Sequence, residues 1–250
     1  SIPLDLGVWL LQQQFRQQYG APAPRVRGRV RKMKGTFSGG TAASLKATMA
    51  AAAAAPGLMD LLKNPFALTP GFEGPRQPVG HKPMLDELLG LWVAPFIMAT
   101  INTRNVHRSN FLLGQPYGAD FCYDEMLITG PGERGQAVAE AVAKDDSLGR
   151  EDGPQPGEGP SRAEREAGFY DVLFIATSAD GQQQQRLGVR GDRDPGYGST
   201  SKMITEAALC LLQDATATPG GIWTPASALG QPLVDRLQAH AGLRFEAEAV

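Results

Sequence analysis

The sequence predicts an α+β fold in which helices pack against one mixed β-sheet. Residues 169–177 form the clearest strand, and Asp180-Gly181 is typical of a hairpin turn before a returning strand at 185–191. Few strand–helix–strand units have the length that a doubly wound parallel sheet needs, because helices and hairpins are mixed along the chain. A hydrophobic fraction of 42% is ordinary for a protein that buries a core. We therefore expect one α+β domain over residues 1–250.

The first third of the chain is expected to hold three helices and one strand. Apolar residues at helical spacing indicate the first helix, and two prolines end it because proline cannot continue a helix. Alanine is the best helix former, so an alanine-rich stretch is expected to be ordered. These elements are a helix over 4–19, a basic strand from 25 to about 37, a helix from 42 to 55 and a short helix over 58–63.

The remaining elements alternate with loops that glycine and proline mark. We expect helices over 94–113, 133–144 and 199–213, a short helix that Ser161 opens, and a last helix through residue 240 that Thr224 or Ser227 caps. We expect two further strands over 119–129 and 243–247. Residues 64–83 are predicted to form an irregular loop, and residues 145–160 a flexible one because they are polar and rich in glycine and proline.

Charge argues against a nucleic-acid partner. The net charge is −2, so there is no global basic field. Basic residues do cluster over residues 25–34, where they alternate with Val26, Val30 and Met33. This alternation predicts a strand with one solvated face, and the alternative is a patch that contacts phosphate.

Cysteine and histidine usage predict a cytoplasmic protein without a metal. Cys122 and Cys210 lie far apart and form no Cys-x-x-Cys pattern, which is typical of a reducing compartment. The three histidines show no metal-ligand spacing. The longest apolar run, residues 88–101, is shorter than the roughly 18–20 residues of a spanning helix, so we expect no membrane span.

The first candidate site is a glycine turn between the basic strand and the alanine-rich helix. It contains Ser38, Gly39, Gly40 and Thr41. The start of a helix offers free backbone N–H groups, which suit an anion or a substrate oxyanion. The spacing matches neither a dinucleotide fingerprint nor a phosphate loop. The alternative is a tight turn that Ser38 caps.

The second candidate is a polar stretch with Asn102, Arg104 and Arg108. On a helix the two arginines lie one turn apart, on a stripe that also carries Ile97 and Ile101. At the edge of a core or in a cleft they would hold a carboxylate or phosphate by paired hydrogen bonds. The alternative is that they extend to solvent or pair with acids of the protein.

The third candidate is the strand exit at Asp194 and Tyr197. Both side chains are expected to face a cleft, where Tyr197 would donate a proton to a reduced substrate. The alternative is an ordinary turn followed by a helix that Ser199 caps. Residues 156–161 are a fourth candidate, either a lid over a pocket or a plain connector.

Seven segments in order resemble the saccharopine dehydrogenase-like oxidoreductases, a group that includes the trans-acting enoyl reductases. The segments are residues 1–7, 35–44, 95–110 with their Ile-Asn-Thr-Arg core, 117–120, 157–161, 194–198 and 221–226. Each is a weak motif, whereas the ordered set spans nearly the whole chain. Residues 1–7 are similar to the segment that follows the family's cofactor domain, and Ser1 is not preceded by Met, so we expect a truncated chain. The alternative is that an initiator Met was removed before Ser1.

The resemblance implies a two-domain plan similar to that of saccharopine reductase. An N-terminal Rossmann domain would bind NAD(P)H, and this chain would be the second domain, which closes over a small-molecule substrate and often mediates homodimers. The implied reaction is hydride transfer to the double bond of a lipid- or polyketide-type enoyl substrate. The glycine fingerprint is absent from this chain. The Rossmann domain would therefore come from the same or another protein, and the chain alone would be inactive.

Two rival interpretations stay open. The first is a non-enzymatic binding or dimerisation module, since no self-sufficient catalytic constellation is visible. The second is a binder of small anions that uses the turn from Ser38 to Thr41 together with Arg104 and Arg108.

Overall fold

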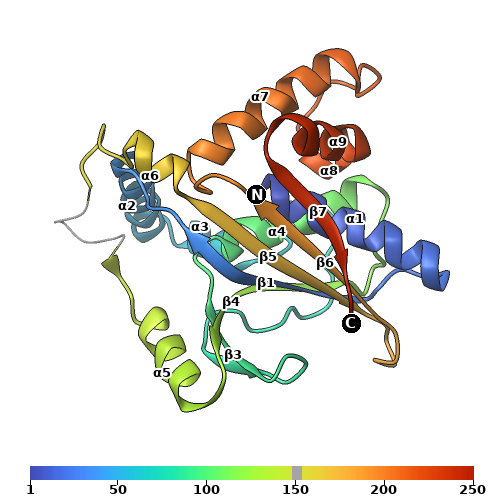
Figure 1. Ribbon diagram of the computed structural model, residues 1–250, viewed down its shortest axis with the longest axis horizontal. Helices are drawn as coiled ribbons and strands as arrows, with labels where there is room; N and C mark the ends of the chain where they lie inside the picture. The colour runs from blue at the N-terminus through green and yellow to red at the C-terminus, as the bar shows by residue number, and fades with distance from the viewer. Residues whose placement is uncertain (148–153) are drawn as a thin grey trace.

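A seven-stranded mixed sheet organises the chain, as the computed structural model shows for residues 1–147 and 154–250 (Figure 1). The strand order is β2-β3-β4-β1-β5-β6-β7. Strands β1 and β4 pair in parallel, and the other neighbours pair antiparallel. The strands are β1 (Arg25–Lys34), β2 (Met84–Asp86), β3 (Leu91–Pro95), β4 (Cys122–Gly130), β5 (Phe169–Thr177), β6 (Gln184–Gly191) and β7 (Leu243–Glu248). The expected α+β class with a mixed sheet is confirmed.

Most helices correspond to those expected from the sequence, but the single last helix expected through residue 240 is divided at Leu229 into two helices. The helices are α1 (Ile2–Tyr19), α2 (Gly39–Ala54), α3 (Pro56–Lys63), α4 (Ala99–Leu112), α5 (Gly132–Ala143), α6 (Arg162–Glu166), α7 (Gly198–Gln213), α8 (Pro225–Ala228) and α9 (Gly230–His240). Ser161 forms the expected capping box of α6. None of the helices in the described ranges is long and apolar enough to cross a membrane.

The helix expected over residues 94–113 is wrong at its start. Residues Leu91–Pro95 form β3, which pairs with β4, and the helix begins only at Ala99. A short apolar run does not distinguish a strand from a buried helix by periodicity, which explains the error. Ile97 and Ile101 are also about half exposed, so the apolar stripe that we expected along this helix does not face the core.

One face of the sheet is covered by α1 and α4. Leu4, Val8, Leu11 and Phe15 recur at helical spacing on α1 and pack into a buried cluster with side chains of β1, β4, β5 and β6. Gly7 lets the helix approach closely, because a Cβ there would lie 2.6 Å from the ring of Phe174. A second cluster joins α7, α8 and α9 to β7.

The other face of the sheet carries the arginines of β1. We expected this face to be solvated, and that expectation is wrong for Arg29, which is 1% exposed. Its guanidinium donates hydrogen bonds to Asp86 at 2.7 Å and to Asp124 at 2.8 Å. Arg31 pairs with Asp171 and Glu248. Acids from distant segments therefore allow these charges to be buried, because a buried charge needs a partner.

Candidate functional site

Several chain segments meet where the central strands β1 and β6 end and β5 begins, and we call this end of the strands the Tyr197 edge of the sheet. Lys34 at the end of β1 pairs with Phe169 at the start of β5, and Tyr170 pairs with Gly191 at the end of β6. Helix α2 follows β1, helix α7 follows β6, and α6 precedes β5. The starts of α2 and α7 are therefore brought together at this edge, although 159 residues separate Ser38 from Tyr197.

The hydroxyl of Tyr197 joins these two helix starts. It accepts a hydrogen bond from the backbone N–H of Ser38 at 2.6 Å and lies 3.1 Å from the hydroxyl of Thr41. The hydroxyl of Ser38 accepts from the N–H of Thr41 at 3.3 Å, so the expected cap of α2 is confirmed. Because Tyr197 already accepts an N–H bond, its own proton is available to Thr41 or to a bound molecule.

Asp194 is the buried support of this arrangement. Its carboxylate accepts hydrogen bonds from the N–H groups of Gly196, Tyr197 and Gly198 at 3.1, 2.9 and 2.6 Å. Asp194 thus accepts from the N–H of Gly198, the first residue of α7, whose N-cap position is Tyr197, and the interpretation that Ser199 caps this helix is wrong because Ser199 lies within it. A fully buried carboxylate with three N–H donors fixes the turn that places Tyr197.

Residues 155–159 lie over the start of α2. Gly39 donates its N–H to the carbonyl of Glu158 at 3.0 Å. A Cβ on Gly39 would lie 1.8 Å from the carbonyl oxygen of Gln155, so this position requires glycine. Part of the loop expected at 145–160, residues 148–153, lies outside the described residues. The carbonyl of Glu158 therefore already accepts from an N–H group at the start of α2 that an anion would otherwise use.

Asn102 belongs to a different cluster, which is buried between α4 and β4. Its amide donates to Glu125 at 2.8 Å and accepts from the hydroxyl of Ser1 at 2.9 Å, and Tyr123 donates to Glu125 at 2.8 Å. Burial raises the pKa of Glu125 to about 8. Glu125 pairs with Gly28 on β1. At ~3.3 Å per residue, the cluster lies some ~20 Å along the strand from the Tyr197 edge.

Arg104 and Arg108 hold backbone segments against α4. Arg104 donates to the carbonyls of Asn64 and Thr100. Arg108 donates to the carbonyls of Leu68 and Ile222, both at 2.8 Å. None of these hydrogen-bond partners belongs to the start of α2. The assignment of the two arginines to substrate stays a prediction.

Sequence reasoning missed a buried network around Asp5. Its carboxylate accepts from Ser109 at 2.5 Å and from the N–H of Ala226 at 2.8 Å, and Ser109 lies 2.6 Å from the hydroxyl of Thr224. Burial raises the pKa of Asp5 to about 6. The signal available in the sequence was Asp5 itself, an acidic residue among the apolar residues at the start of the first helix. The network joins α1, α4 and α8, and its burial indicates a structural role.

His107 is held in an apolar setting rather than in a metal site. Its ring lies 4.7 Å from that of Phe66 and 5.8 Å from that of Phe121. Burial lowers its pKa to about 4, so the imidazole is neutral at physiological pH. Over residues 1–147 and 154–250, no group of three or more His, Cys, Asp or Glu side chains is placed to hold a metal ion.

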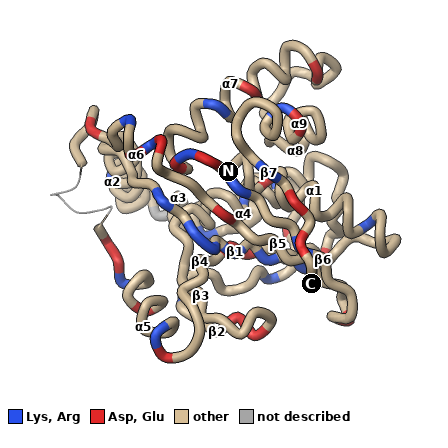
Figure 2. Tube along the Cα trace, viewed as in Figure 1, with Lys and Arg blue, Asp and Glu red and all other residues tan. Residues whose placement is uncertain are grey.

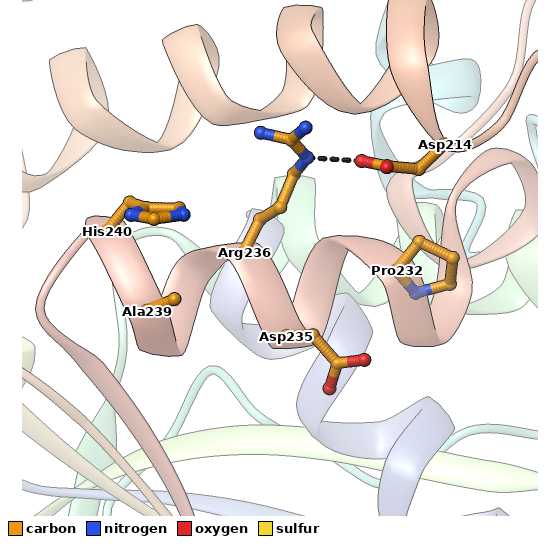
Figure 3. Close-up of a pocket in the computed structure, with 6 residues that line it drawn as sticks. All are labelled: Asp214, Pro232, Asp235, Arg236, Ala239 and His240. Atoms are coloured by element: carbon orange, nitrogen blue, oxygen red, sulfur yellow. Dashed lines mark hydrogen bonds and ion pairs between the residues drawn. The ribbon is translucent and has the colours of Figure 1, made fainter.

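A surface hollow of about 450 Å³ lies away from these residues, between α9 and the end of α7 (Figure 3). Its lining residues are Asp214, Pro232, Asp235, Arg236, Ala239 and His240. Arg236 forms an ion pair with Asp214 and a second one with Glu206 at 3.1 Å. The guanidinium is therefore already engaged, and we place the candidate site at Tyr197 instead.

Comparison with known proteins gives relatives that share one name. A Mycobacterium tuberculosis protein, named provisionally as a trans-acting enoyl reductase, is 34% identical over 98% of this chain and 64% of the relative. A trans-acting enoyl reductase of Mycobacterium ulcerans is 29% identical over 95% of this chain and 63% of the relative. A third, from Mycobacterium bovis, is 30% identical over 80% of this chain and 54% of the relative.

The similarity supports the trans-acting enoyl reductase part of the resemblance. The chain spans less than two thirds of each of these relatives. No protein-family model matches the chain, and no solved structure matches it.

Proposed function

We propose that this chain is the substrate-side domain of a trans-acting enoyl reductase. The observation that carries the proposal is the contact of Tyr197 with Ser38 and Thr41, which brings together two of the segments that resemble the family. Its support is the similarity over nearly the whole chain to relatives with that name. The substrate would be a lipid- or polyketide-type enoyl compound.

Tyr197 would protonate the substrate after hydride transfer. Reduction of an enoyl group adds hydride to one carbon and a proton to the other, so the reaction needs a proton donor at the site. The N–H bond from Ser38 stabilises negative charge on the tyrosine oxygen when the proton leaves. Asp194 would act only as a positioning residue, because its oxygens accept three N–H bonds.

NAD(P)H would be held mainly by a Rossmann domain with a plan like that of saccharopine reductase. The described residues of this chain do not themselves fit a dinucleotide. The sheet has one parallel strand pair, and the start of α2 already donates Gly39 N–H to Glu158 and Ser38 N–H to Tyr197. A dinucleotide site instead needs free N–H groups at a helix start after a parallel strand.

Calorimetric titration of the 250-residue chain with NADPH tests this division of labour. We expect no binding in the micromolar range, because the N–H groups of Ser38 and Gly39, at the start of the helix that follows parallel strand β1, already have partners. Micromolar affinity would show that the chain holds the cofactor itself and would contradict the proposal. For the rival interpretation as a binding or dimerisation module, the distinguishing result is the absence of enoyl reduction once a cofactor domain is supplied.

A further inference from the structure

The face of the sheet opposite α1 and α4 carries a set of arginines over a buried apolar floor. In Figure 1 these two helices lie behind β1, β5 and β6. Ile175 and Leu173 on β5 are 0% and 5% exposed, yet they belong to neither helix-packed cluster. Figure 2 shows Lys and Arg along β1 next to this strand. Arginine stems can cover apolar residues in this way while their charged heads stay near the surface.

Two arginines flank Ile175 in one row across the sheet. In the strand register Arg27 on β1 pairs with Ile175 on β5, and Ile175 pairs with Arg186 on β6. Directly paired residues share a face, so the three side chains point to the same side. Neighbouring strands are ~4.8 Å apart, which puts the two arginine backbones some ~10 Å from each other. Both long side chains can therefore reach a group that sits above Ile175.

The acids on this face are already used by other arginines. Asp124 pairs with Arg25 and Arg29. Glu248 pairs with Arg31 and Arg190. Each carboxylate thus receives two guanidiniums. Arg27 and Arg186 form no ion pair with any residue in the described ranges, although Asp124 and Glu248 are their strand partners at the two ends of the row.

The donors of these two arginines are poorly satisfied. Arg27 has one long hydrogen bond, 3.4 Å to the hydroxyl of Thr177. Burial, followed by the nearby charge of Arg25, lowers its pKa. The Nε of Arg186 is buried and has no hydrogen-bond partner among the described residues. A buried donor without a partner costs free energy, so an acceptor at this place would stabilise the protein.

We propose that Arg27 and Arg186, with Thr177 beside them, form a binding site for a phosphate-type oxyanion on the face of the sheet opposite α1 and α4. A phosphate group offers several acceptor oxygens that match the fork of a guanidinium. The group could belong to free phosphate or to a larger ligand that carries a phosphate ester. This site is separate from the Tyr197 edge, and the proposed reaction does not depend on it.

Thermal unfolding with inorganic phosphate as the probe tests the site. The comparison solution contains chloride at equal ionic strength, and titration calorimetry gives the affinity. We expect saturable stabilisation of the native chain and at least tenfold weaker binding in the Arg27→Gln, Arg186→Gln double variant. The matched control is Arg244→Gln, since Arg244 is an exposed arginine on β7 of the same face, and we expect it to bind within twofold of the native chain. A phosphomonoester such as glycerol phosphate distinguishes the ester from the free ion.

Three results would overturn the proposal. The first is no saturable binding of phosphate to the native chain. The second is equal binding by the double variant. The third is a native dimer, measured by sedimentation, that dissociates in the double variant while phosphate does not bind, because the face would then be an interface between copies. If the double variant does not fold, Arg27→Lys with Arg186→Lys keeps both charges and must still weaken binding. None of these measurements involves Tyr197 or enoyl reduction, so they leave the proposed function untouched.

Discussion

Glu125 is a carboxyl group that the fold buries without a direct ion pair to a side chain. Asn102 and Tyr123 donate hydrogen bonds to it, and neither carries a positive charge. Burial disfavours the charged form and raises the pKa from 4.5 to about 8. The carboxyl group is therefore protonated in the folded protein at neutral pH. The family resemblance drew attention to Asn102, but composition and spacing gave no sign of the acid that it contacts.

This raised pKa makes the stability depend on pH. Between the unfolded pKa and the folded pKa, the folded state holds a proton that the unfolded state releases. The free energy of unfolding should thus fall as pH rises from about 6.5 to 8, by about 1.4 kcal/mol per pH unit for one proton, because below pH 6.5 the lowered pKa of His107 adds a slope of the opposite sign. The contribution is fully present below pH 4.5 and is lost as pH rises through 8. Urea unfolding at successive pH values measures the slope.

The Glu125→Gln variant should flatten that slope, because the amide keeps the shape and the hydrogen bonds but does not titrate. Glu140→Gln, at an exposed glutamate on α5, is the matched control and should keep the native slope. Asp5, whose pKa is raised from 3.8 to about 6, contributes a slope of the same sign that is confined to pH values below about 6 and remains in both variants. An unchanged slope in Glu125→Gln would show that this group ionises without cost.

At the scale of elements, the start of α2 shows which features local sequence can and cannot predict. Ser38 as the cap follows from its type and position before the helix. The contact with Tyr197 does not, because it depends on β5 lying between β1 and β6. The turn before α7 also escaped local reasoning: the carboxylate of Asp194 reaches forward to three N–H groups, whereas Ser199 already lies within the helix.

Two adjacent glycines give a sharp test of the packing at this helix start. Gly39→Ala would place a Cβ 1.8 Å from the backbone of Gln155, so residues 155–159 must move and the bond from Gly39 to Glu158 is lost. We expect a loss of about 1–3 kcal/mol in unfolding free energy. Gly40→Ala has 3.6 Å to the nearest atom and should be neutral or stabilise by up to about 1 kcal/mol. Equal effects in denaturant unfolding would contradict this packing.

At the scale of the whole molecule, the fold class and most elements followed from periodicity and turn residues. The exceptions have physical reasons. Strand β2 has three residues and β3 five, which is too short for a periodic pattern. The buried state of Arg29 depends on Asp86 and Asp124, which lie 57 and 95 residues away in the chain. Long-range pairing of this kind is visible only in the folded sheet.

Only part of the candidate site was predictable, because its assembly also depends on long-range pairing in the sheet. The segments with Ser38, Thr41, Asp194 and Tyr197 were each recognisable as turns with useful side chains, and the sheet brings them to one edge. Arg104 and Arg108 were recognised as a pair on one helix face, but their backbone partners could not be foreseen. Residue type and spacing indicate candidates, whereas topology decides which of them meet.

The most direct test of the proposed function is the kcat for NADPH-dependent reduction of an enoyl thioester by the native chain and by Tyr197→Phe. The chain is joined for this purpose to the part of the Mycobacterium tuberculosis relative with which it does not align. We expect the native fusion to reduce the substrate and Tyr197→Phe to lower kcat by about 100-fold or more with little change in KM, because general acid catalysis typically contributes this much. Tyr19→Phe, which removes a hydroxyl that donates to Gln184 on the far end of the sheet, should leave kcat unchanged. A Tyr197→Phe fusion as active as the native one, or a folded native fusion without activity, would contradict the account.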